Sequence, residues 1–149
     1  MTTAWPPPVA RTGPVDQMMV GALSGWSDER LAALLKDRPD LAHPPPVGFA
    51  ALAVRAAMSG SVALCLRRLN LFEQQLVNGL CLLENGTTEK GLVDLLGEPV
   101  EPAVMEAGLA RLEALALVVR NRGRLHSVDG VRSMQFPAGL GPPAEAGLG

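Results

Sequence analysis

Hydrophobic residues recur at helical spacing in the middle of the chain. In LFEQQLVNGLCLLE, residues 71 to 84, one stripe consists of Phe72, Leu76, Leu80 and Leu83. Asn70 and Glu73 provide a capping pair at its start. The next apolar run, EKGLVDLL, predicts a short helix that Thr87 or Thr88 caps and Gly97 ends. Two successive helices, a longer and a shorter one, are therefore expected between residues 70 and 97.

A third helix and a hairpin are expected next. Pro102 suits the first position of the helix PAVMEAGLARLEAL, which places Met105, Leu109, Leu112 and Ala116 on one face. The β-leaning runs 117–120 and 124–128 then flank Asn121-Arg122-Gly123, a short hairpin signal. This order predicts a winged helix-turn-helix over residues 71–136. An unrelated small helical bundle closed by a hairpin is the alternative interpretation.

Further helices precede this unit. In WSDERLAALLKDR, Ser27 is placed to cap a helix that Pro39 ends. Two more short helices are expected within residues 49–69. The predicted fold class is mainly α, with a helical N-terminal part packed on a winged helix-turn-helix that carries a small β-hairpin wing.

Prolines divide the chain into four predicted segments. We expect a flexible N-terminal segment at 1–20, a helical subdomain at 21–70, the winged helix at 71–136, and a Pro/Gly-rich tail or linker at 137–149. The tail lacks a sustained period, so the chain resembles a fragment or a shortened relative of a longer protein.

Composition narrows the function classes. The chain has 149 residues, of which 48% are hydrophobic and 19% charged, with a formal net charge of -2. This charge excludes wholesale binding of polyanions, so any contact with nucleic acid needs a local basic patch. Cys65 and Cys81 lie within apolar helical runs and are expected to be reduced core thiols. Arg55 interrupts the longest apolar region and no secretion signal begins the chain, which predicts a soluble cytoplasmic protein.

The predicted wing carries the local basic patch. Four arginines lie at or near it and are the candidate DNA-binding residues: Arg120, Arg122, Arg124 and Arg132. Guanidinium groups bind phosphate in a bidentate manner or enter a minor groove. Between residues 87 and 136, however, six basic residues face seven acidic ones. The sequence leaves two interpretations open, a wing that follows phosphates and a solvated hairpin tip.

The outer face of the third helix is poorly suited to reading bases. It combines alanines with acidic residues, and phosphates repel carboxylates while alanine offers no hydrogen bond. This face is therefore a candidate partner-binding surface, with Glu106, Ala110 and Arg111 as the candidate residues.

Catalysis finds little support in the sequence. His43 and His126 lack a nearby acid or nucleophile that would form a triad pattern. The histidines and cysteines lack metal-ligand spacing, and no phosphate-binding glycine-rich loop is present. We predict a protein that is not an enzyme, with no catalytic residue, no metal and no cofactor.

Two segments of the chain are the most specific, DERLAALLKDRPDLAHPPP and RLNLFEQQL, and GTTEKGLVDLLG and LARLEALALVVRNRGRLHSV add weaker support. Together they carry a resemblance to the N-terminal region of bacterial helicase-associated proteins with an XPB-type helicase N-terminal-domain signature. It spans roughly residues 23 to 143. It implies a non-catalytic protein linked to DNA repair or transcription, and it supplies no catalytic residue.

The leading hypothesis is a helicase-associated winged-helix module. It would bind a protein partner, such as a helicase or another DNA-processing protein, with weak backbone-directed DNA contact through the wing and no contact with a membrane. The alternative is a sequence-specific transcription regulator that reads bases through the third helix. A ligand sensor or small enzyme with a pocket between the two parts of the chain is a third interpretation.

Overall fold

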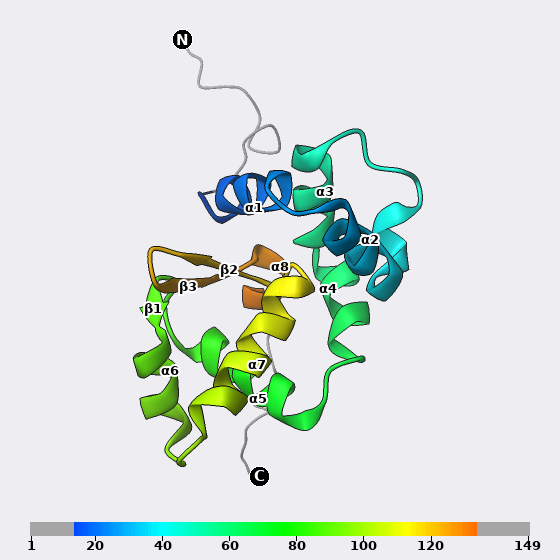
Figure 1. Cartoon of the computed structure of the whole chain (residues 1–149). Coiled ribbons are helices and arrows are strands. Elements are labelled where there is room, and N and C mark those ends of the chain that lie inside the picture. The colour runs from blue at the N-terminus through cyan, green and yellow to red at the C-terminus, as the bar shows by residue number, and fades with distance from the viewer. Residues whose placement is uncertain (1–13, 134–149) are drawn as a thin grey trace.

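The computed structural model describes residues 14–133 and is mainly helical, as predicted, with a small antiparallel sheet (Figure 1). The helices of the first half are α1 (Pro14–Ser24), α2 (Asp28–Asp37), the 3₁₀ helix η2 (Pro39–Ala42), α3 (Phe49–Ala56) and α4 (Ser59–Leu66). The second half contains α5 (Leu71–Leu82), β1 (Thr87–Thr88), α6 (Glu89–Leu96), α7 (Pro102–Ala114), β2 (Val118–Asn121), β3 (Arg124–Ser127) and α8 (Asp129–Arg132).

Helix α1 corrects the prediction of a flexible segment over residues 1–20. It begins at Pro14, and it buries Val15, Met19 and Leu23, which recur every four residues on one face. The face packs against α3 and β2. This apolar spacing was visible in the sequence, but the neighbouring prolines obscured it. Residues 1–13 and the predicted tail at 137–149 lie outside the described residues.

Local capping signals fix the helix boundaries as expected. The Ser27 side chain accepts a hydrogen bond from the Arg30 backbone N–H at 3.1 Å, and Thr88 does the same for Gly91 at 3.1 Å. Asn70 and Glu73 form a reciprocal capping box at the start of α5. Gly97 ends α6 with a φ of 74°, a left-handed conformation that glycine adopts at little cost.

The sheet has the strand order β1-β3-β2, and both strand pairs are antiparallel. The hairpin turn consists of Arg122 and Gly123, with φ values of 55° and 76°, respectively. Positive φ at both central residues matches the right-handed twist of the strands and gives a tight two-residue turn. Strand β1 was not predicted, because two residues carry no alternating pattern.

One hydrophobic core runs through the described chain, from Val15 in α1 to Val131 in α8. It therefore spans both sides of the predicted boundary between residues 70 and 71, where α5 begins. Figure 1 shows α1 on one side of the β2–β3 hairpin and α6 and α7 on the other. The contacts of α4 and α5 with α8 close this arrangement.

A buried arginine connects the two halves. Arg38 has 1% of its surface exposed, and its guanidinium donates to the Leu115 carbonyl at 2.8 Å and the Ala56 carbonyl at 2.9 Å. It also donates to the Ser61 hydroxyl, which in turn donates to Asp40. Burial lowers the pKa of Arg38, opposed by the charges of Cys65 and Asp40. The sequence placed Arg38 only at the end of a helix, so this role was missed.

Candidate interaction surfaces

Arg120, the first arginine of the predicted wing, is surrounded by carboxylates. Its Nε donates to Glu113 at 2.8 Å, and its two terminal nitrogens donate to Glu106 at 3.1 and 3.0 Å. Glu89 lies 3.9 Å away. The hydrogen bond with Glu106 raises the pKa of Arg120 and lowers the pKa of Glu106. Arg120 thus ties β2 to α7, and its donors are already engaged.

Arg132 lies in α8 and not in the hairpin, and its guanidinium is also hydrogen-bonded within the molecule. It donates to the carbonyls of Leu80 at 2.9 Å and Leu83 at 2.7 Å. These carbonyls lie at the end of α5, where the last acceptors lack intrahelical partners; the Leu80 carbonyl also accepts from the Leu83 backbone N–H at 3.3 Å. Arg132 therefore caps α5 and does not extend a basic wing surface.

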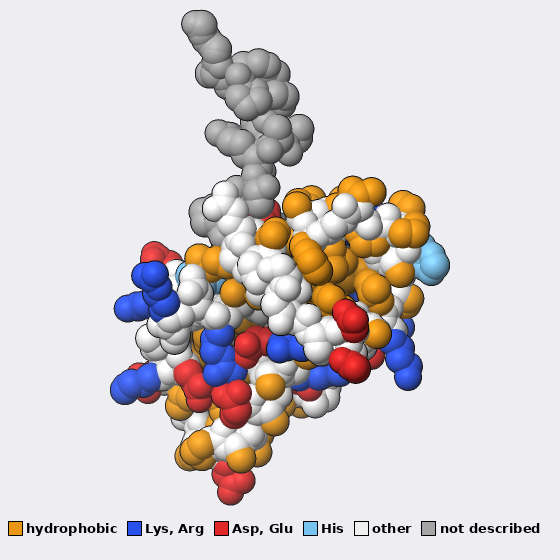
Figure 2. All heavy atoms as spheres, turned by 45° about the horizontal axis from the view of Figure 1, so that its top comes forward, with side chains coloured by type: hydrophobic (Ala, Val, Ile, Leu, Met, Phe, Trp, Pro, Cys, Tyr) orange, Lys and Arg blue, Asp and Glu red, His pale blue; other side chains and the backbone are white. Residues whose placement is uncertain are grey.

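The other two arginines face solvent near the tip. Arg122 occupies the turn and makes no hydrogen bond or ion pair within residues 14–133. Arg124 is exposed and donates one hydrogen bond to the Gly86 carbonyl at 2.8 Å. Figure 2 shows basic side chains at the left-hand edge of the molecule, on the side of the hairpin. Two of the four candidate wing arginines are therefore open to a phosphate.

Helix α7 presents the outer face that the sequence indicated, with one correction. Ala103, Glu106, Ala107 and Ala110 are exposed. Arg111 is only partly exposed and turns away from that face, because it lies 3.7 Å from Asp37 and 3.8 Å from Glu73. Of the candidate partner residues, Glu106 and Ala110 share the outer face, whereas Arg111 bridges α7 to α2 and α5.

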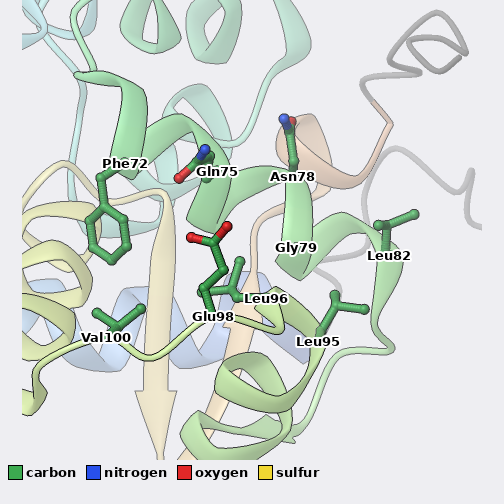
Figure 3. A pocket seen from close by; sticks show the side chains of 9 residues that line it. All are labelled: Phe72, Gln75, Asn78, Gly79, Leu82, Leu95, Leu96, Glu98 and Val100. Carbon is green, nitrogen blue, oxygen red and sulfur yellow. The ribbon is translucent and has the colours of Figure 1, made fainter.

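Two grooves flank Phe72, and sequence reasoning missed both. The first lies between α5 and α6 and has a volume of about 360 Å³ (Figure 3). It is lined by Phe72, Gln75, Asn78, Gly79, Leu82, Leu95, Leu96, Glu98 and Val100. The second, of about 370 Å³, lies between α5 and α7 and includes Asn70, Val104 and Ala107. The available signal was the surplus of apolar residues on α5, where Leu71 and Leu82 fall outside the buried stripe.

The histidines and cysteines form no metal cluster within residues 14–133. Cys65 and Cys81 are free thiols, and burial raises the pKa of both. His43 is exposed in the loop after η2, and His126 lies in β3. Burial, and to a lesser degree the charge of Arg124, lower the pKa of His126.

A second apolar area lies over α3 and the loop before it. Figure 2 shows hydrophobic side chains gathered at the upper right of the view, and Val47, Val54 and Met58 are among the exposed apolar residues. Across the described chain, no individual helix has the length and hydropathy to cross a bilayer. The pair α3 and α4, bent by 67°, meets both criteria only when taken together.

Comparisons with known proteins found no match to this chain. This holds for family models, curated proteins and solved structures. The resemblance to helicase-associated proteins stays a prediction from the quoted segments.

Proposed function

We propose that this chain is a non-catalytic winged-helix module that binds a protein partner through the outer face of α7. In this proposal, the hairpin tip adds only weak contact with a nucleic-acid backbone. The order of α5, β1, α6, α7, β2 and β3 supports the winged-helix assignment, as does the position of β3 between the other two strands.

The arrangement around Arg120 carries the proposal. In a winged helix, α7 is the element placed to enter a major groove. Its outer face offers Glu106 and alanines, and the basic side chain beside that face, Arg120, already donates to Glu106 and Glu113. Phosphates repel such a surface, and alanine cannot read a base edge. Small side chains, in contrast, let another protein surface approach closely.

The same observation disfavours the sequence-specific regulator. That function requires donors and acceptors on α7 that reach base edges, and the exposed residues Ala103, Ala107 and Ala110 supply none. A helicase or another DNA-processing protein as the partner rests only on the resemblance described above. So does the link with DNA repair or transcription.

Site-specific crosslinking tests the protein partner. A photo-crosslinking amino acid at Ala107 or Ala110 is expected to capture the same protein in the native host, since both residues lie on the proposed surface. The matched control is Ala33, an exposed alanine on α2. The captured protein is then purified and its binding measured directly. Equal capture from all three positions, or no binding by the purified protein, would contradict the proposal.

Fluorescence anisotropy tests the DNA component with labelled duplex and forked DNA over a salt series. We expect weak binding without sequence preference, and a salt slope that falls by about one for each lost phosphate contact when Arg122 and Arg124 are changed to alanine. Tight binding with an enriched sequence motif would instead support the regulator.

A further inference from the structure

The groove between α5 and α6 combines apolar walls with a few polar side chains in its lining. Figure 3 shows the Glu98 carboxylate directed from the turn after α6 toward α5, in the space between Phe72 and Asn78, with the Gln75 side chain nearby. Leucines from both helices form the remaining walls: Leu82, Leu95 and Leu96. A few polar groups that converge within an apolar cleft are typical of a binding site.

The polar side chains of this groove have no partner in the part of the chain that the structure describes. The side chains of Gln75, Asn78 and Glu98 make no hydrogen bond or ion pair among residues 14–133. The acidic residues of the neighbouring surface differ, because Glu73 caps α5 and Glu106 binds Arg120. The Glu98 carboxylate and the two side-chain amides are thus available to an external donor.

The charge of the lining has one sign. Neither this groove nor the one between α5 and α7 contains a lysine or arginine in its lining. Glu98 lines the first groove, and Glu73 lines the second, where Arg111 lies 3.8 Å from its carboxylate and offsets part of its charge. The two grooves share Phe72, so a ligand that passes over this ring reaches from α6 to α7. A cationic ligand is complementary to such a surface, and an anionic one is repelled.

The exposed apolar side chains indicate a ligand larger than a single cation. Leu82 is 77% exposed and Leu95 is 41% exposed, and both belong to the groove lining. Large apolar groups that gather beside a cleft mark interaction sites. A helix that presents apolar and basic residues on one face satisfies both the leucines and the carboxylate.

We propose that the groove between α5 and α6 binds a basic amphipathic helix of the partner protein. An arginine side chain of that helix donates to Glu98 and to the side-chain oxygen of Gln75, beside the ring of Phe72. Its apolar residues pack against Leu82 and Leu95. This inference rests on the proposed function in that the partner is a protein, and it names the chemistry of that partner.

A labelled helical peptide of about 15 residues tests the inference with the full chain. It carries leucine, arginine and leucine on one face at helical spacing, and a control peptide replaces the arginine with citrulline, which keeps the shape and loses the charge. We expect the arginine peptide to bind roughly tenfold more tightly than the citrulline peptide. Side-chain amide resonances of Gln75 and Asn78 are expected to shift on its addition.

Matched variants localise the binding. Glu98→Gln is expected to lower the affinity for the arginine peptide by roughly tenfold and to leave the affinity for the citrulline peptide unchanged. Glu101→Gln removes another exposed carboxylate, one outside the groove lining, and is expected to change the affinity for the arginine peptide by less than about twofold. Equal effects of the two variants, equal affinity for the two peptides, or no binding of either would overturn the inference.

A second copy of the chain is the competing occupant. Sedimentation analysis that detected a dimer dissociated by Leu82→Ser would assign the groove to self-association and overturn the inference. The proposed function is tested by a different experiment, the crosslinking at Ala107 and Ala110 on α7, so the two can fail independently. Peptide binding that fails while those crosslinks persist overturns only the assignment of the groove.

Discussion

The base and the tip of the hairpin use arginine in different ways. Arg120 in β2 binds carboxylates of α7, and Arg132, which follows the hairpin in α8, binds carbonyls of α5. Arg122 and Arg124 near the tip face solvent. Four basic residues that lie close together in the sequence therefore do not form one basic surface. Whether a guanidinium binds an external phosphate depends on which acceptors the fold has already placed beside it.

Arg38 extends this comparison to a fully buried arginine and gives the largest expected effect. Arg38→Ala leaves the carbonyls of Ala56 and Leu115 without donors and creates a cavity. We expect a loss of about 3 kcal/mol or more in the free energy of unfolding, measured by urea denaturation. Lys36→Ala, at an exposed position near the end of the same helix, is the control and should change stability by less than about 0.5 kcal/mol. Similar losses of stability in the two variants would show that the buried hydrogen bonds of Arg38 do not stabilise the fold.

Arg132→Ala is expected to cause the next largest loss, about 1 to 3 kcal/mol. The substitution removes the donors to Leu80 and Leu83 at the end of α5. Thermal and urea unfolding monitored by circular dichroism would measure it. A variant as stable as the wild type, with reduced affinity for DNA, would instead show that Arg132 contacts DNA as part of the wing.

The Arg120–Glu106 pair predicts a smaller, pH-dependent effect. The pKa of Glu106 is lowered in the folded state, chiefly by its hydrogen bond with Arg120. The stabilisation from this shift is present above the ordinary glutamate pKa of about 4.5 and is lost as pH falls through the lower pKa of the folded state. The stability difference between the wild type and Glu106→Gln should therefore shrink below about pH 4.5 in unfolding curves measured as a function of pH. A difference that is constant from pH 7 to about pH 3 would show that the pair does not stabilise the ionised form.

Arg122→Asn is expected to have the smallest effect on stability. The free energy of unfolding should change by no more than about 0.5 kcal/mol, with the variant the more stable protein. Arg122 has a φ of 55°, and asparagine adopts this conformation more readily than arginine. The same change removes an exposed charge from the hairpin turn. Loss of residual DNA binding by this variant, at unchanged thermal stability, would assign that binding to the tip. Unfolding of the variant would mean that the arginine side chain stabilises the turn.

Much of the secondary structure could be predicted, because its signals are local. Ser27, Asn70 and Thr88 each cap a helix within three residues of their own position. The hairpin follows from Gly123 between two β-leaning runs. The helix α1 was missed although Val15, Met19 and Leu23 show its period, because prolines before it favoured an irregular segment. The strand β1 is too short to carry a pattern, and it forms only because β3 lies beside it.

The candidate site was less predictable. The outer face of α7 followed from its helical period, so Glu106 and Ala110 were placed correctly on it. Arg111 was placed on the same face, but it bridges to Asp37 and Glu73 on other helices. The groove at Glu98 depends on how α6 packs against α5, and no period within either helix reports that packing.

The sequence by itself determined the order of the helices, their caps and the position of the hairpin, since these depend on residues within a few positions of one another. The tertiary structure decided which charged groups are satisfied and which stay available. Arg38 reaches a carbonyl 77 positions away, and Arg132 reaches one 52 positions away. A long guanidinium side chain binds whichever acceptors packing brings near, so its role follows from the assembled core and not from its neighbours in the sequence.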